Sequence, residues 1–227
     1  MTVVCGEHPE VIGWLETHDI DVLTVRENAM LPIPTARHAD MLCFSCGDGK
    51  GFTYDALLCE ELKRRGYDFS IPTVPLGAAY PNDIRLNCLL IGKWLIANVP
   101  HIAPEIKEWA RGNGVDIVSV RQGYARCSTL AVNGNAAITA DKGIADTLRS
   151  RGIDVLQIEP GHIRLDGYEY GFIGGASAVL GDMVLFFGDP LSHPCGADIV
   201  RFIEAHGSRI ETTGAHELRD LGSCVMI

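Results

Sequence analysis

Helix-like stretches and short β-rich runs alternate along the chain in a recurring order. Five times, a helix-like stretch reaches a turn containing Gly or Asp, and a run rich in Val, Ile or other strand formers follows. Glycine just past the last helical turn is typical of a helix C-terminus, and short β-branched runs are typical of strands. The pattern predicts five helix–turn–strand segments, at residues 14–25, 61–74, 109–120, 148–158 and 202–213.

The predicted strands follow one another at a regular distance. They begin at residues 20, 67, 115, 153 and 208, so that neighbouring starts are 38 to 55 residues apart. A period in the forties that continues through the whole chain is typical of repeat architectures. The alternative is two unrelated α/β domains divided near residue 100, where "NVPHIAP" resembles a linker, but the repeat continues across that point.

Hairpin-like pairs of strands complete each repeat. Gly-Lys, Asn-Gly and Gly-Asp pairs, which two-residue hairpin turns favour, lie within three of them. We predict these hairpins at residues 41–53, 87–97, 128–139 and 177–187. The last repeat has only one hairpin strand, "CVMI", and the first repeat lacks its opening hairpin strand. If the first strand of the chain completes the last hairpin, five strand–strand–helix–strand units close into a ring.

We therefore expect one α/β domain over residues 1–227. Its approximate repeats are 1–40, 41–83, 84–126, 127–170 and 171–227.

Charge narrows the classes of partner. The chain has 227 residues, 47% of them apolar, and a formal net charge of −10. Such a charge repels nucleic acid and anionic lipid surfaces and favours a cationic small molecule. The first residues do not have the pattern of a signal peptide, and the apolar runs are too short to span a bilayer. We expect a cytoplasmic protein that binds neither nucleic acid nor membranes.

The eight cysteines are spaced irregularly, which in a chain without a secretory signal is typical of reduced thiols. Cys43 and Cys46 form one C-x-x-C pair. A zinc site would need a second ligand pair at suitable spacing, and only His38 and Cys59 lie near. A turn rather than a helix follows the pair, which disfavours a thioredoxin-like site. We interpret both cysteines as small residues on a strand and its turn.

The repeat pattern, which covers the whole chain, resembles the pentein fold of the guanidino-group-modifying enzymes. The segments "RHADML", "QGYARCS" and "GYEYGFIGGAS" are similar to a bacterial branch of that superfamily outside the enzymes of known chemistry. The resemblance implies a five-fold pseudosymmetric α/β propeller with outward helices and strand ends around a central channel. It further implies that a Cys, a His and acidic residues act there on a guanidinium carbon, without a metal or organic cofactor.

Residues just before the first strand of each hairpin occupy equivalent positions around such a ring. Most units offer a carboxylate or a thiol at this point. The candidates are His38, Asp40, Asp83, Asn87, Arg126, Cys127, Glu169, Tyr170, Asp220, Ser223 and Cys224. Among these, we expect Asp40, Asp83 and Glu169 to hold the cationic group of a substrate. The full set expected to face the substrate is His38, Asp40, Asp83, Asn87, Arg126, Glu169 and Asp220.

Two thiols compete for the role of nucleophile. Cys127 follows Arg126, a neighbour that would lower its pKa, in a turn before an apolar strand. Cys224 lies near the end of the chain, where the nucleophile of penteins usually lies. The "CS" at 127–128 resembles the end of dimethylargininase, displaced here to a middle repeat. Either cysteine could instead be a small buried residue, because free cysteine is among the most buried residue types.

The proton carrier also has two candidates. His162, in "EPGHIRLDGY", lies where the resemblance places the general base, and its alternative role is that of a turn residue. His38 and Asp40 lie on one face of an extended segment, so that Asp40 could orient the imidazole.

The segment "GFIGGAS" at 171–177 matches no phosphate-binding loop. We expect its small residues to allow the backbone to approach other backbone near the centre of the ring.

Two functions remain open. One is a cysteine-dependent hydrolase, deiminase or amidinotransferase acting on a small cationic guanidine or amidine. The sequence lacks the Gly-Gly-Asn or Gly-Gly-x-x-x-Cys motif that usually precedes the pentein nucleophile. The other function is a non-catalytic protein that binds a small ligand or another protein on the same scaffold. Homodimer formation is also left open.

Overall fold

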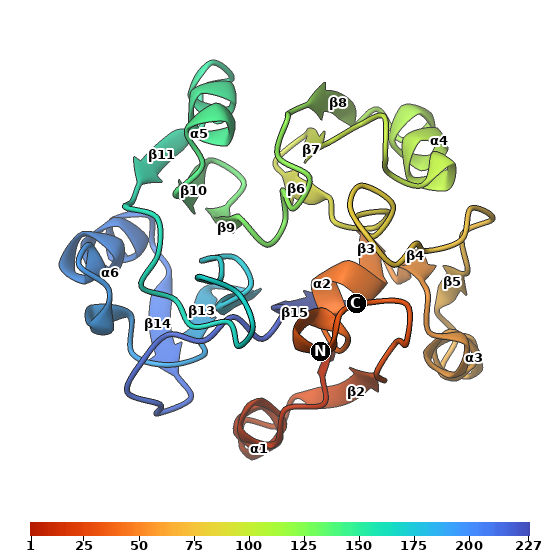
Figure 1. Ribbon diagram of the computed structural model, residues 1–227, viewed down its shortest axis with the longest axis horizontal. Helices are drawn as coiled ribbons and strands as arrows, with labels where there is room; N and C mark the ends of the chain where they lie inside the picture. Colours follow the sequence, from red (N-terminus) through yellow and green to blue (C-terminus); the bar gives the residue numbers. More distant parts are fainter.

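Five three-stranded sheets form a ring in the computed structural model, which describes residues 1–227, and one helix lies outside each sheet (Figure 1). In each sheet, two strands are antiparallel and the third runs parallel to the central one, after the helix. The parallel strand needs a crossover connection, which the helix supplies. The arrangement is the predicted five-fold α/β propeller.

Four units follow the order hairpin, helix, strand. The second unit contains β3 (Cys43–Gly47), β4 (Lys50–Thr53), α3 (Ala56–Arg64) and β5 (Asp68–Ser70). The third contains β6 (Leu89–Ile91), β7 (Trp94–Ala97), α4 (Pro104–Gly112) and β8 (Asp116–Ser119). The fourth contains β9 (Thr129–Asn133), β10 (Ala136–Thr139), α5 (Lys142–Arg149) and β11 (Asp154–Gln157). The fifth contains β12 (Ser177–Leu180), β13 (Met183–Phe186), α6 (Gly196–Ala205) and β14 (Arg209–Thr212).

Strands from the two ends of the chain close the ring. β15 (Cys224–Met226) pairs antiparallel with β1 (Thr2–Gly6), and Cys5 lies opposite Cys224. The helix α1 (Pro9–Thr17) then leads to β2 (Asp21–Val25), which pairs parallel with β1. Figure 1 shows both chain ends near the short helix α2 (Ala39–Leu42). The first strand therefore completes the last hairpin, as predicted.

The local signals predicted the outer strands closely. Each of the five strands begins one residue after its predicted start. In four units the turn between helix and strand contains a glycine with positive φ, a conformation that glycine adopts without steric cost. These glycines are Gly66, Gly114, Gly152 and Gly207.

One predicted hairpin boundary is wrong. Residues 41 and 42, expected in the first strand of the hairpin, belong to α2, because their amides bond to the His38 carbonyl oxygen. This single helical turn sets His38 and Asp40 at the centre of the ring rather than along a strand.

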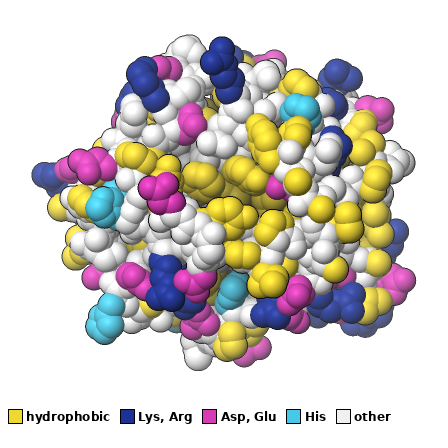
Figure 2. All heavy atoms as spheres, viewed as in Figure 1, with side chains coloured by type: hydrophobic (Ala, Val, Ile, Leu, Met, Phe, Trp, Pro, Cys, Tyr) yellow, Lys and Arg dark blue, Asp and Glu magenta, His cyan; other side chains and the backbone are white.

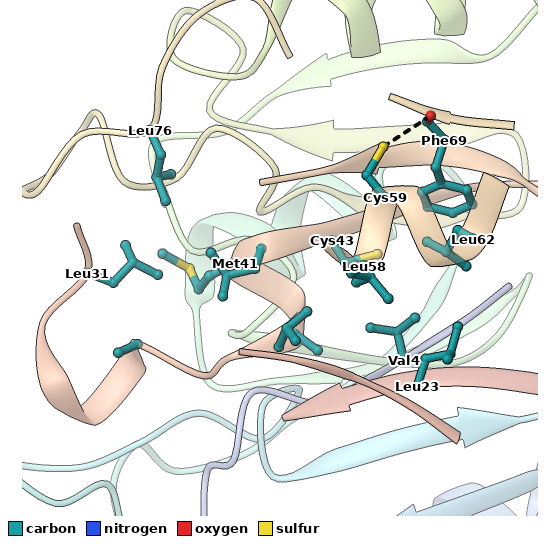
Figure 3. Packing of buried hydrophobic residues seen from close by; sticks show 14 of the residues in the cluster. Val4, Leu23, Leu31, Met41, Cys43, Leu58, Cys59, Leu62, Phe69 and Leu76 are labelled. Atoms are coloured by element: carbon teal, nitrogen blue, oxygen red, sulfur yellow. Dashed lines mark hydrogen bonds between the residues drawn. The ribbon is translucent and has the colours of Figure 1, made fainter. Parts of the chain in front are cut away.

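The core is divided among the junctions between units. Each of five clusters of buried apolar residues joins neighbouring units, and together they run around the whole ring. At the first junction, Val4 and Leu23 pack with Cys43 and Phe69, and the Cys59 thiol donates to the Phe69 carbonyl oxygen at 3.3 Å (Figure 3). Two short 3₁₀ helices, Ile33–Thr35 and Pro190–Ser192, complete the structure.

All eight cysteines are free thiols, and Cys43 and Cys46 lie on β3 as interpreted from the sequence. The longest helix has 10 residues, and no helix is both long and apolar enough to cross a bilayer.

Candidate functional site

Cys127 lies at the centre of the ring, in the turn that precedes β9. The Asn87 side-chain amide donates to the Cys127 Sγ at 2.9 Å. The Asn87 Oδ1 accepts from the backbone amides of Arg126 at 2.9 Å and Cys127 at 3.4 Å. Asn87, itself fully buried, therefore fixes both the thiol and the turn that carries it.

Glycines of the 171–177 segment hold this turn in place. The Gly175 amide donates to the Cys127 carbonyl oxygen at 3.0 Å. A Cβ added to Gly174 would lie 2.3 to 2.6 Å from the carbonyl oxygens of Arg126, Cys127 and Thr129. No side chain fits there, so the expectation that small residues allow a close backbone approach is confirmed.

His38 lies between two carboxylates. Its Nδ1 is 4.0 Å from the Asp40 Oδ1 and 3.8 Å from the Asp220 Oδ1. His38 is 2% exposed, Asp40 1% and Asp220 3%. These separations exceed hydrogen-bond length, and the His38 Nδ1 and both Asp40 oxygens have no partner in the protein. Buried polar atoms are almost always satisfied, so these groups are the place to expect a polar or charged ligand.

Backbone contacts orient Asp220 instead. Its Oδ2 accepts from the Phe172 amide at 2.9 Å and its Oδ1 from the Gly222 amide at 3.2 Å. Gly222 has a positive φ of 76°, and a Cβ there would lie 2.3 Å from the His38 Cα. The backbone of the fifth unit at Gly222 therefore packs directly against His38.

Burial sets the protonation states of the group. It raises the pKa of the Cys127 thiol well above its usual value, and the negative charges of Asp40 and Asp220 raise it further. It lowers the pKa of His38, against the opposing effect of Asp40. Burial also raises the pKa of Asp40, and that of Asp220 to about 6. The thiol and the imidazole are therefore neutral near pH 7.

The lowered pKa expected for Cys127 beside Arg126 is not found, because its pKa is raised. The guanidinium turns away from the thiol and donates to the Ser223 Oγ at 2.9 Å. Burial has the largest effect on the pKa of Cys127, and the charges of Asp40 and Asp220 raise it further. Adjacency in sequence put the two residues together, but their side chains leave the backbone in different directions.

Cys127, His38 and Asp220 share the wall of one cavity of about 250 Å³. Aromatic rings form much of the remaining wall: the Tyr124 and Phe172 ring centroids are 6.3 Å apart, and those of Tyr170 and Phe172 are 6.4 Å apart. We call this the thiol cavity. Its full lining is Thr35, His38, Met41, Tyr124, Cys127, Leu165, Tyr168, Glu169, Tyr170, Phe172 and Asp220.

A second cavity, of about 320 Å³, lies between the inner strands of the ring. Asp40, Arg126 and Cys224 line it together with apolar residues of β3, β6, β9, β12 and β15. Viewed along the short axis of the molecule, hydrophobic side chains gather around the centre of the ring (Figure 2). Asp40 borders this second cavity and also lies close to His38 of the thiol cavity.

The two candidate nucleophiles lie on different cavities. Cys224 is buried on β15 opposite Cys5, and its pKa is raised well above the usual value by interaction with the Cys5 thiol and by burial. No histidine lines its cavity, whereas Cys127 shares one with His38.

The remaining predicted residues are more dispersed. His162 is exposed, has a φ of 61°, and packs its ring 5.5 Å from that of His193, away from both cavities. Asp83 is buried and accepts from the Tyr124 hydroxyl at 2.8 Å, so it supports the cavity wall from behind. Glu169 lines the thiol cavity.

Sequence reasoning missed the aromatic wall. Tyr124, Tyr168 and Phe172 were not proposed as site residues, although two of the segments that carried the family resemblance contain them. Their repeated pairing with glycine was the available signal. No group of three or more His, Cys, Asp or Glu side chains is arranged to hold a metal ion.

Comparison with family models identifies the family of the chain. A family model described as "Family of unknown function (DUF6873)" matches residues 3–225. No curated protein matches the chain.

Several solved structures are similar over most of the chain. A dimethylarginine dimethylaminohydrolase mutant from Pseudomonas aeruginosa, complexed with citrulline, has a TM-score of 0.59 and 10% identity, covering 94% of this chain and 91% of that one. The amidinotransferase SxtG of Microseira wollei has a TM-score of 0.58 and 9% identity, and the match covers 95% of this chain and 77% of that one. The agmatine deiminase of C. jejuni has a TM-score of 0.57 and 7% identity, and the match covers 94% of this chain and 75% of that one. These similarities confirm the predicted pentein fold.

Proposed function

Because the chain belongs to the family of unknown function DUF6873 and has the pentein fold, we propose that it is a cysteine-dependent enzyme acting on a guanidine or amidine. One observation carries the proposal. Cys127, His38 and Asp220, each at most 4% exposed, converge on one cavity at the centre of the ring. A thiol, an imidazole and carboxylates are the groups that amidine hydrolysis or transfer requires.

The carboxylates attract the cationic substrate. Asp220 lines the cavity, and Asp40 lies buried behind His38 with two unpartnered oxygens. A guanidinium bound beside Cys127 offsets the negative charge that raises the pKa of the thiol, because an opposite charge within a few ångströms favours the ionised form. The thiol thus becomes a nucleophile only when a cation is bound.

The chemistry follows from these positions. The thiolate attacks the guanidinium carbon, and a C–S bond forms as the π-electron pair moves to nitrogen. The C–N bond to the departing amine then breaks as His38, protonated by the thiol, returns that proton to the amine. Water attacks the remaining carbon as His38 takes one of its protons. The C–S bond then breaks as a C=O bond forms, His38 returns its proton to the sulfur, and the hydroxyl proton passes to solvent, which leaves the thiol and a ureido product. An amine in place of water gives amidine transfer.

A non-catalytic cation-binding protein is the alternative. The raised pKa of Cys127 and the lowered pKa of His38 favour it, because neither group is charged in the absence of a ligand. In that case the same carboxylates would bind a cation without covalent chemistry.

Thiol reactivity separates the two functions. The native protein is treated at about pH 6 with chloroacetamidine, a cation, or with neutral chloroacetamide, and all eight cysteines are followed by mass spectrometry. Enzymatic function predicts that Cys127 reacts first and prefers the amidine. If every thiol reacts slowly and neither reagent is preferred, the result would contradict enzymatic function and support the non-catalytic binding function.

The two candidate histidines can be compared with matched substitutions. We expect His38→Asn to lower guanidine turnover by about 10²- to 10⁴-fold, the usual contribution of a positioned acid–base group. His162→Asn should change turnover by less than about twofold, because His162 is exposed and asparagine tolerates its positive φ. Steady-state kinetics measure both, and the opposite ranking would return the role to His162.

Cation affinity should rise with pH. The pKa of Asp220 is about 6 in the folded protein against 3.8 ordinarily, so the folded state holds this proton more tightly than the unfolded chain does. Asp220 therefore contributes its whole stabilising free energy to the folded state below pH 3.8, and this contribution is lost as the pH rises through about 6. Ionisation over the same range strengthens cation binding.

We expect the affinity for a simple alkylguanidine to increase several-fold between about pH 5 and 7. Asp220→Asn should flatten this dependence, and isothermal titration calorimetry at several pH values measures it. An unchanged slope in the variant would exclude Asp220 as the titrating group.

A further inference from the structure

We propose that the substrate of the thiol cavity is a guanidine without a carboxylate, carrying an amine at its remote end. This inference rests on the proposed function and names the substrate class within it. It follows from the charges and the aromatic faces of the cavity wall, which suit a cation at both ends of the ligand and offer no Lys or Arg side chain to an anion.

The cavity has acidic but no basic side chains in its wall. Asp220 and Glu169 line it, and none of its eleven lining residues is Lys or Arg. An amino-acid substrate would place its carboxylate among acidic groups without a counter-ion. Like charges that face one another without a counter-ion disfavour such a ligand.

Four arginines adjoin residues of the wall in sequence, and each is already engaged. Arg37 donates to the Glu27 Oε2 at 2.8 Å, and Arg219 donates to the Glu10 Oε1 at 3.1 Å.

The other two arginines are also engaged. Arg164 lies next to Leu165 of the wall, but its Nε contacts the Asp166 Oδ1 at 2.7 Å and its terminal nitrogen the Glu217 Oε1 at 2.9 Å. Arg126 donates to Ser223 and lines the second cavity. Neither guanidinium is therefore directed to a ligand carboxylate in the thiol cavity.

Aromatic faces suit the cationic ends instead. Tyr168 is 50% exposed and Tyr170 37%, on either side of Glu169. Phe172 lies edge-to-face with Tyr170, closer along the chain to the glycines that hold Cys127. Rings of this kind attract ammonium and guanidinium groups through their π-electrons. Glu169 adds a carboxylate among them that an amine can approach.

Agmatine and arginine test the inference, because the two molecules differ by one carboxylate. Titration calorimetry uses Cys127→Ser, so that turnover does not disturb binding. We expect agmatine to bind at least about tenfold more tightly than arginine. Equal or tighter binding of arginine would overturn the inference. Binding of neither ligand would overturn it too, while labelling of wild-type Cys127 by chloroacetamidine judges the proposed function separately.

Variants of the wall identify the source of the preference. Glu169→Gln should narrow the ratio of agmatine to arginine affinity, whereas Glu204→Gln, an exposed change on the outer helix α6, should leave it unchanged. Tyr170→Leu should weaken agmatine several-fold and Tyr170→Phe should preserve it, because only the ring is needed. An unchanged ratio in Glu169→Gln together with unchanged agmatine affinity in Tyr170→Leu would contradict the proposed recognition.

Discussion

Cys127→Ser should lower guanidine turnover by at least about 10³-fold, since removal of a covalent nucleophile commonly costs this much or more. Serine is nearly isosteric with cysteine, and its oxygen can still accept the amide hydrogen of Asn87 that Cys127 Sγ accepts at 2.9 Å. The turn before β9 is therefore preserved while the nucleophile is lost. Release of amine or ammonia from the guanidine measures the effect.

Cys224→Ala is the matched control for this substitution. Cys224 is equally buried but lies on β15 opposite Cys5 and borders the other cavity. We expect the Cys224→Ala variant to keep guanidine turnover within about threefold of the wild type, because loss of this thiol removes packing rather than a reacting group. Loss of turnover in the Cys224 variant alone would transfer the nucleophile to β15 and the chemistry to the second cavity.

Gly222→Ala should lower the free energy of unfolding by about 3 kcal/mol. An L-residue at a φ of 76° costs about 1–2 kcal/mol, and overpacking adds roughly 1–3 kcal/mol. The overpacking arises because the new Cβ would lie 2.3 Å from the His38 Cα and 2.4 Å from its Cβ. Urea unfolding followed by circular dichroism measures the change.

Gly13→Ala provides the comparison for a harmless added methyl group. Gly13 is helical, in α1, and a Cβ there meets no atom within 4 Å. Alanine should raise the free energy of unfolding by up to about 1 kcal/mol, because it loses less backbone entropy than glycine on folding. Similar unfolding midpoints for both variants would contradict the close contact between Gly222 and His38.

The fold was predictable because its signals are local and repeated. A glycine beyond each of four helices and a β-rich run after it located the outer strands to within one residue, and the unpaired "CVMI" pointed to closure by the first strand. Such signals depend on φ preference and strand propensity within a few residues. They survive sequence divergence well enough for the repeat to be visible in one chain.

The site was only partly predictable, because it depends on how loops fold. His38 and Asp40 were candidates, but the single turn α2 that brings them to Asp220 has no capping signal: the His38 side chain makes no capping hydrogen bond. His162 satisfied a motif, yet a positive φ and its contact with His193 keep it outside the cavities. Asn87, expected to face substrate, contacts the Cys127 thiol instead.

The pairing of β1 with β15 changes how stability is counted. An open array of five units has four interfaces and two outer faces that need polar caps. The ring has five units and five apolar interfaces, so every unit has two neighbours and no terminal face remains. Closure thus gains one whole interface without adding a unit. For that reason a defect at any one junction leaves each unit still attached on its other side.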